Sequence, residues 1–127
     1  MMHTRTLAVP SMAPGGLDAS RSGHFGRCDA FTLVDVRAGE VVSTRVVDNV
    51  EHTTGGCLVP VDLLHREGTH ALVVAGIGAG PLQGFRRVGI DVLVGPGETV
   101  AEVVAAHLRG ATCGIAENAV CGNHGHE

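Results

Sequence analysis

The feature that most constrains the fold is a pair of short apolar runs separated by a glycine turn and a helix-length segment. The runs are HALVVA at residues 70–75 and IDVLV at residues 90–94. Continuous apolar runs of this length are typical of strands buried on both faces of a sheet. The segment between them opens with the glycine-rich turn 76–81 and predicts a short helix to about Val88. Strand, helix and strand form a βαβ unit, which predicts helices packed on a sheet with parallel strands.

The first half of the chain predicts three further strands. Residues 4–9 form a short strand that Pro10 ends, and the runs 31–36 and 41–47 have strand character. The hairpin-like turn at residues 37–40 makes the last two strands antiparallel neighbours.

Two helices complete the predicted order. One covers about residues 58–67, with Pro60 in its first turn and Gly68 after its end. The other runs to Arg109, and Thr99 with Glu102 gives it a capping box. The chain is therefore expected to have an α/β fold in the order β-β-β-α-β-α-β-α, with a mixed sheet of about five strands and helices on its faces.

The length of 127 residues fits one domain. We expect that domain to cover residues 1–110, and residues 111–127 to form a flexible tail that contains Cys and His. A net charge of −4 and the absence of Trp and Tyr argue against nucleic acid as a partner. No secretory signal or membrane-length apolar run is visible, so a cytoplasmic protein without a membrane partner is expected. Its four cysteines are then expected to be thiols or ligands, not disulfides.

The segment 22–28 (SGHFGRC) brings an imidazole, a guanidinium and a thiol together between two glycines. His24 and Cys28 are of the types that bind Fe, Cu, Zn and iron–sulfur cores. Arg27 could neutralise an anionic cluster. The alternative is a loop histidine, a surface arginine and a buried structural cysteine.

A second pair of the same kind follows at His52 and Cys57. Cys57 lies just ahead of the predicted helix 58–67, where the helix dipole lowers a thiol pKa. Gly55 and Gly56 would let a ligand approach the backbone closely. The alternative is a tight turn followed by a small core residue.

Other candidate groups are weaker. The glycine turn 76–81 is either an anion-binding nest or an ordinary strand-to-helix turn. In the tail, Cys121, His124 and His126 have the spacing of a metal-capture pattern. Structural roles are expected for His65 and His70, and for His107 as a hydrogen-bonded core residue.

The chain lacks the serine-elbow, phosphate-loop and zinc-protease motifs of common enzymes. We therefore expect a protein without catalytic activity, although His52 and Cys57 could in principle act as base and nucleophile.

Taken together, these motifs resemble the dinitrogenase iron–molybdenum cofactor biosynthesis family, over about residues 5–109. The resemblance rests on a set of segments: residues 17–20 leading into 22–27, residues 31–36, His52 with residues 55–57, residues 73–80, residues 89–92 and the capped last helix. It implies a ribonuclease H-like fold without nuclease activity. It also implies that His24 contacts a cluster, with His52 and Cys57 near it.

The resulting hypothesis is a carrier of a metal–sulfur cluster, either iron–sulfur or one that also contains Mo or Cu. Residues His24, Arg27, Cys28, His52 and Cys57 would hold it. Cluster donor and acceptor proteins would be the partners of a monomer or weak homo-oligomer. The alternative is a redox or regulatory module in which Cys28 and Cys57 form a reversible disulfide.

Overall fold

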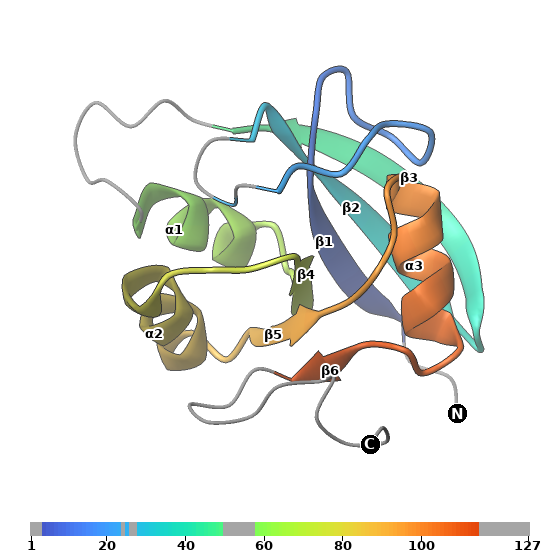
Figure 1. Cartoon of the computed structure of the whole chain (residues 1–127). Helices are drawn as coiled ribbons and strands as arrows, with labels where there is room; N and C mark the ends of the chain where they lie inside the picture. Colours follow the sequence, from blue (N-terminus) through green and yellow to red (C-terminus); the bar gives the residue numbers. More distant parts are fainter. Residues whose placement is uncertain (1–3, 24, 26–27, 50–57, 115–127) are drawn as a thin grey trace.

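The computed structural model is a mixed α/β fold in which a six-stranded sheet lies between helices on both of its faces (Figure 1). It describes residues 4–23, 25, 28–49 and 58–114. The described elements, in chain order, are β1 (Arg5–Ser11), β2 (Ala30–Arg37), β3 (Glu40–Asp48), α1 (Leu58–Arg66), β4 (Ala71–Val74), α2 (Ala79–Arg87), β5 (Asp91–Val94), α3 (Val100–Leu108) and β6 (Cys113–Gly114).

The first eight elements follow the order expected from the sequence, and β6 is an addition. Cys113 and Gly114 pair antiparallel with Val94 and Leu93 of β5. The sheet therefore has six strands instead of about five, in the order β3-β2-β1-β4-β5-β6. A strand of two residues has no periodicity that a sequence pattern could reveal.

β1 continues through Pro10, where the sequence predicted its end. Pro10 pairs with Phe31 of the antiparallel neighbour β2, whereas the parallel pairing with β4 runs through Leu7 and Ala8. The missing N–H of Pro10 therefore falls beyond the ladder with β4, where it costs no hydrogen bond. The carbonyl of Pro10 accepts the N–H of Ser22 at 2.8 Å, which keeps the chain against the end of the strand.

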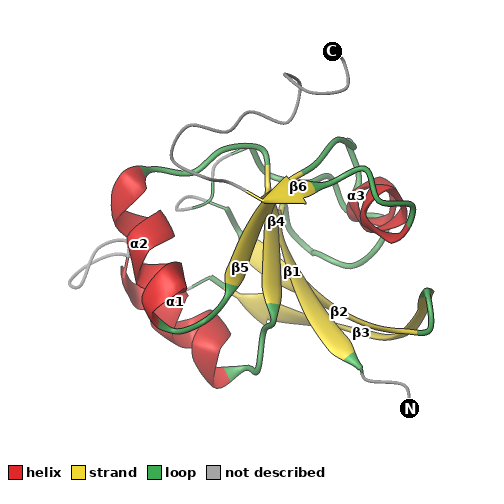
Figure 2. Cartoon of the chain, turned by 90° about the horizontal axis from the view of Figure 1, so that it is seen from below, coloured by secondary structure: helices red, strands yellow, loops and turns green. Residues whose placement is uncertain are grey.

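The two faces of the sheet carry separate cores. α1 and α2 cover one face and α3 covers the other (Figure 2). In β4, Leu72 and Val74 belong to the core under α1 and α2, and Ala71 and Val73 belong to the core under α3. Because both faces are covered, this strand is apolar at every position, as residues 70–75 predicted.

The capping box predicted for α3 is present in a modified form. The Thr99 hydroxyl oxygen accepts the Glu102 N–H at 3.2 Å. The Glu102 carboxylate accepts the N–H of Glu98 at 2.8 Å, one residue earlier than in the usual reciprocal pair. The start of α3 is thus fixed relative to the end of β5.

None of the helices among the described residues has the length and apolar character required to cross a lipid bilayer.

Candidate functional site

The carboxyl ends of β1, β4 and β5 meet at one edge of the sheet, because these strands are parallel to one another. β2 begins and β3 ends at the same edge, since both pairings of β2 are antiparallel. After β1 the chain continues to β2, on one side of the pair β1 and β4. After β4 it continues through α2 to β5, on the other side of that pair. Such a reversal between neighbouring strands is a topological switch point, where open α/β sheets bind ligands. This carboxyl edge is therefore the candidate site.

The loop that connects β1 to β2, residues 12–29, crosses the carboxyl edge. Its first half, residues 12–22, is held by hydrogen bonds to the start of α3. The N–H groups of Val100 and Ala101 donate at 2.9 Å to the carbonyls of Ala19 and Leu17. These bonds satisfy N–H groups that have no partner inside the helix. The N-terminus of α3 is therefore occupied by the protein's own loop.

Arg21, in the first half of the loop, is a site residue that the sequence analysis missed. Its Nη1 donates to the carbonyl of Gly95 at 2.6 Å and to that of Gly97 at 3.2 Å, in the turn between β5 and α3. Burial lowers the pKa of the guanidinium. Its partners lie 74 and 76 residues away along the chain, so no local pattern could have indicated the contact.

In the second half of the loop, Phe25 and Cys28 make apolar contacts under α1 and α2. Phe25 is 5% exposed, and its ring centroid lies 5.7 Å from that of Phe31 and 5.3 Å from that of Phe85. Edge-to-face and tilted aromatic pairs at these distances are favourable. Cys28 is buried in the same core. The motif 22–28 thus sends two apolar side chains into the core.

The Cys28 thiol has the character of a core group. Its Sγ donates to the carbonyl of Phe25 at 3.2 Å. Burial is the main cause that raises its pKa to about 11 from the ordinary 9.0. A thiolate is the form that binds metals and attacks disulfides. At neutral pH Cys28 is therefore protonated, which fits the structural alternative for this residue better than a role as ligand or redox partner.

Asn49 joins the end of β3 to the loop between β1 and β2. Its side-chain Nδ2 donates to the carbonyl of Cys28 at 2.8 Å, and its backbone N–H donates to the carbonyl of Asp29 at 3.1 Å. The segment 50–57, which carries His52 and Cys57, follows directly after Asn49. The end of the first His–Cys motif is therefore in direct contact with Asn49, three residues before His52 in the sequence.

Cys28 is the one predicted ligand that the structure describes. The other predicted site residues, in the motif, the following loop and the tail, lie outside the described residues: His24, Arg27, His52, Cys57, Cys121, His124 and His126. Among the residues that are described, no three His, Cys, Asp or Glu side chains are grouped closely enough to hold a metal ion.

The expectation that all four cysteines are thiols or ligands is wrong for Cys113. This residue of β6 is disulfide-bonded, while Cys28 is free. The expectation came from the predicted compartment and not from geometry, so the sequence held no signal against it.

Two histidines have the structural roles that the sequence predicted. The Nδ1 of His70 accepts the backbone N–H of Thr6 at 2.9 Å, which connects the start of β4 to β1. The Nδ1 of His107 lies 3.0 Å from the Thr112 hydroxyl, and burial lowers the pKa of its imidazole. Both side chains serve the fold.

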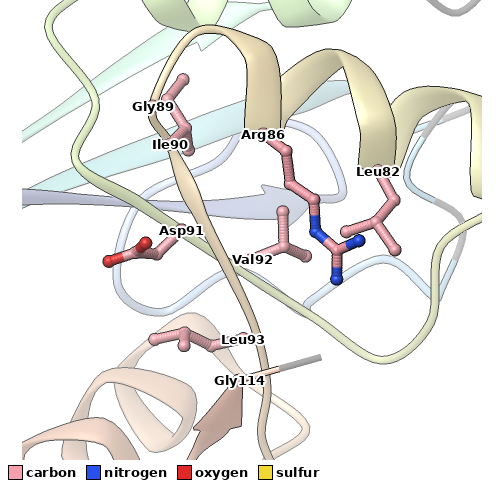
Figure 3. Close-up of a pocket in the computed structure, with 8 residues that line it drawn as sticks. All are labelled: Leu82, Arg86, Gly89, Ile90, Asp91, Val92, Leu93 and Gly114. Atoms are coloured by element: carbon pink, nitrogen blue, oxygen red, sulfur yellow. The ribbon is translucent and has the colours of Figure 1, made fainter. Parts of the chain in front are cut away.

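A surface pocket of about 450 Å³ lies along β5 and α2, away from the switch point. Figure 3 shows Asp91 and Leu93 on one side of the strand, and Val92 with Leu82 and Arg86 on the other. Its polar groups therefore do not converge on one point, as they do in most ligand sites. The glycine turn predicted at residues 76–81 is shorter in the structure, because α2 already begins at Ala79, and its N-cap Gly78 offers no side-chain bond.

Comparisons with known proteins show one matching family and several proteins of similar sequence and fold. The family model described as dinitrogenase iron-molybdenum cofactor matches residues 6–110. An uncharacterised protein of Methanocaldococcus jannaschii is 29% identical over 91 residues, covering 70% of this chain and 77% of its own. The apo form of the orange protein from Desulfovibrio gigas is 28% identical with a TM-score of 0.77, over 90% of this chain and 95% of its own. A Thermotoga structure at 23% identity and a TM-score of 0.72, covering 91% and 99%, shows the same fold.

Proposed function

The chain belongs to the dinitrogenase iron-molybdenum cofactor family, and we propose that it binds and carries a metal–sulfur cluster, or a precursor of an iron–molybdenum-type cofactor, without catalytic turnover. The cluster is cargo that a donor protein supplies and an acceptor protein takes. The family relation supports a role in nitrogenase-cofactor processes, and the choice of a carrier rests on the residues at the carboxyl edge.

The observation that carries the proposal is the contact of Asn49 with Cys28 and Asp29. It ties the end of the first His–Cys motif to the residue that leads into the segment 50–57, at the carboxyl edge of the sheet. In the proposal, His24, His52 and Cys57 supply the ligands, and Arg27 offsets the charge of the cargo. Cys28, with its raised pKa, holds the motif in the core. Cys121, His124 and His126 remain the proposed residues of a separate metal-capture site, and the cysteine ligands of both proposed sites act as thiolates of the reduced chain.

The proposal is tested by anaerobic reconstitution of the full chain, followed by an absorption spectrum from 300 to 700 nm and metal analysis. The chain has no Trp or Tyr, so a sulfur-to-metal band would stand clear of protein absorbance. We expect His24→Ala and Cys57→Ala each to reduce the retained metal several-fold.

His65→Ala is the matched control, because His65 is an exposed histidine in the last turn of α1. It should retain the wild-type amount of metal. Full retention in both site variants would remove the site assignment. A wild-type protein that stays colourless and metal-free after reconstitution would remove the carrier function itself.

A further inference from the structure

Arg21 places a guanidinium inside the carboxyl edge, between the loop 12–29 and the turn that precedes α3. Its backbone pairs with Ser11 at the end of β1, and its N–H donates to the carbonyl of Glu98 at 2.9 Å. The two carbonyls that receive its Nη1 belong to Gly95 and Gly97. The side chain therefore reaches across the ends of three parallel strands, from β1 toward the end of β5.

Within the described part of the chain, one of the three nitrogens of this guanidinium has a partner, Nη1. The Nε and Nη2 atoms are buried and donate no hydrogen bond to any of the described residues. Buried polar atoms without partners are rare in folded proteins, and each one calls for a physical explanation. If Arg21 served only to hold the turn before α3, the hydrogen bonds of Nη1 to Gly95 and Gly97 would be sufficient.

The two unpartnered nitrogens form a single edge of the guanidinium. Their N–H bonds point in parallel, which is the geometry with which arginine grips carboxylates and phosphates through two bonds at once. Hydrogen-bonded carbonyls surround Nη1 with partial negative charge, but no carboxylate of the described residues forms an ion pair with Arg21. Burial without a counter-charge destabilises the cation, in line with its lowered pKa.

We propose that the Nε–Nη2 edge of Arg21 is a binding site for an anion with two neighbouring acceptor oxygens. A tetrahedral oxoanion offers such a pair of oxygens along each of its edges. Such a ligand supplies both the missing hydrogen bonds and the missing counter-charge. Because both donors are buried, binding of the anion requires a local rearrangement around them. The site stands on the contacts of Arg21 and does not depend on cluster carriage. The acceptor edge could belong to a free oxoanion or to the anionic cargo at the same edge of the sheet.

The test is a titration of the apoprotein with molybdate and with phosphate, followed by calorimetry. We expect Arg21→Lys, which keeps the charge but loses the two-bond geometry, to bind about tenfold more weakly or worse. Arg21→Gln should show no binding. The control is Arg66→Gln, because Arg66 is an exposed residue at the end of α1 that pairs with Asp62 at 3.2 Å. It should bind like the wild type.

A second readout does not require any variant to fold well. In a ¹⁵N-correlated NMR spectrum of the wild-type protein, the signal of the buried Nε–H of Arg21 should change its chemical shift on addition of molybdate or phosphate. The Nε–H signals of exposed arginines should keep their positions. The absence of binding by the wild type, or equal binding by Arg21→Lys, would overturn the inference.

Reconstitution of Arg21→Lys distinguishes the two sources of the anion. Loss of the cluster together with loss of molybdate binding would identify the cargo as the anion. Wild-type cluster retention with lost molybdate binding would identify a free oxoanion. Failure of cluster uptake by the wild type would count against the proposed function alone, since the oxoanion titration uses apoprotein.

Discussion

The two halves of loop 12–29 are attached to the same sheet by different forces. Residues 12–22 are held on the α3 side by backbone hydrogen bonds and by Arg21, whereas Phe25 and Cys28 of the second half pack on the α1 and α2 side. Apolar contacts fill space and leave no group unsatisfied, but hydrogen bonds through a charged side chain leave two donors open. The difference indicates that the second half fixes the position of the motif, while the first half retains capacity for a ligand.

The largest expected effect comes from removing the apolar attachment. Phe25→Ala deletes a buried ring that contacts two others, so we expect a loss of about 3–5 kcal/mol in the free energy of unfolding. Urea denaturation measures it. Phe25→Leu, which keeps most of the apolar volume, should cost much less. A loss below about 1 kcal/mol in Phe25→Ala would show that this half of the loop is not held by its apolar side chains.

The second effect appears at high pH. The raised Cys28 pKa stabilises the fold fully below pH 9, and this contribution is lost as the pH rises to about 11. The free energy of unfolding should therefore fall by about 1.4 kcal/mol per pH unit across this window, about 3 kcal/mol in all.

Few other groups interfere with this measurement, because the chain contains no Tyr and all nine of its Lys and Arg residues are Arg. Cysteines are then the only side chains that ionise between pH 9 and 11. Cys28→Ala should remove most of the slope in urea titrations repeated at each pH. An equal slope in both proteins would mean that Cys28 is not the buried thiol described.

The smallest effect concerns the polar half of the loop, at the turn that receives Arg21. Gly97 has φ +130, and an added Cβ would lie 2.8 Å from the backbone N of Val103. Gly97→Ala should therefore cost about 2 kcal/mol more than Gly16→Ala. Gly16 is the matched control because its φ is also positive, at +97, but its Cβ would meet open space. Equal thermal stabilities of the two variants would show that this turn is free to move.

The elements of the fold were largely predictable because their signals are local. The capping pair Thr99 and Glu102, the apolar run 70–75 and the hairpin turn 37–40 each act within a few residues of the chain, and each gave the expected element. The predicted end of β1 was wrong. Pro10 can continue the strand because the hydrogen-bonded pairing with β4 ends before it. The ribonuclease H-like description stays a prediction.

The candidate site was less predictable, because its chemistry depends on contacts between distant segments. The motif 22–28 was found from its residue types, and the topology brings its end to the carboxyl edge beside Asn49. The same motif left Cys28 open between a ligand and a buried structural residue, and its packing among three phenylalanine rings and side chains from α1 and α2 favours the second. Arg21 was missed because its partners lie far away along the chain.

The sequence by itself determined which residues form strands and helices, where α3 begins, and which side chains could carry metal chemistry. Those properties follow from periodicity, capping and residue type, which act over a few positions. Only the tertiary structure decided that Cys28 has a pKa of about 11 and that Arg21 keeps two buried donors without a partner. Burial and desolvation are set by everything that packs around a group, and for Arg21 the decisive neighbours lie more than 70 residues away.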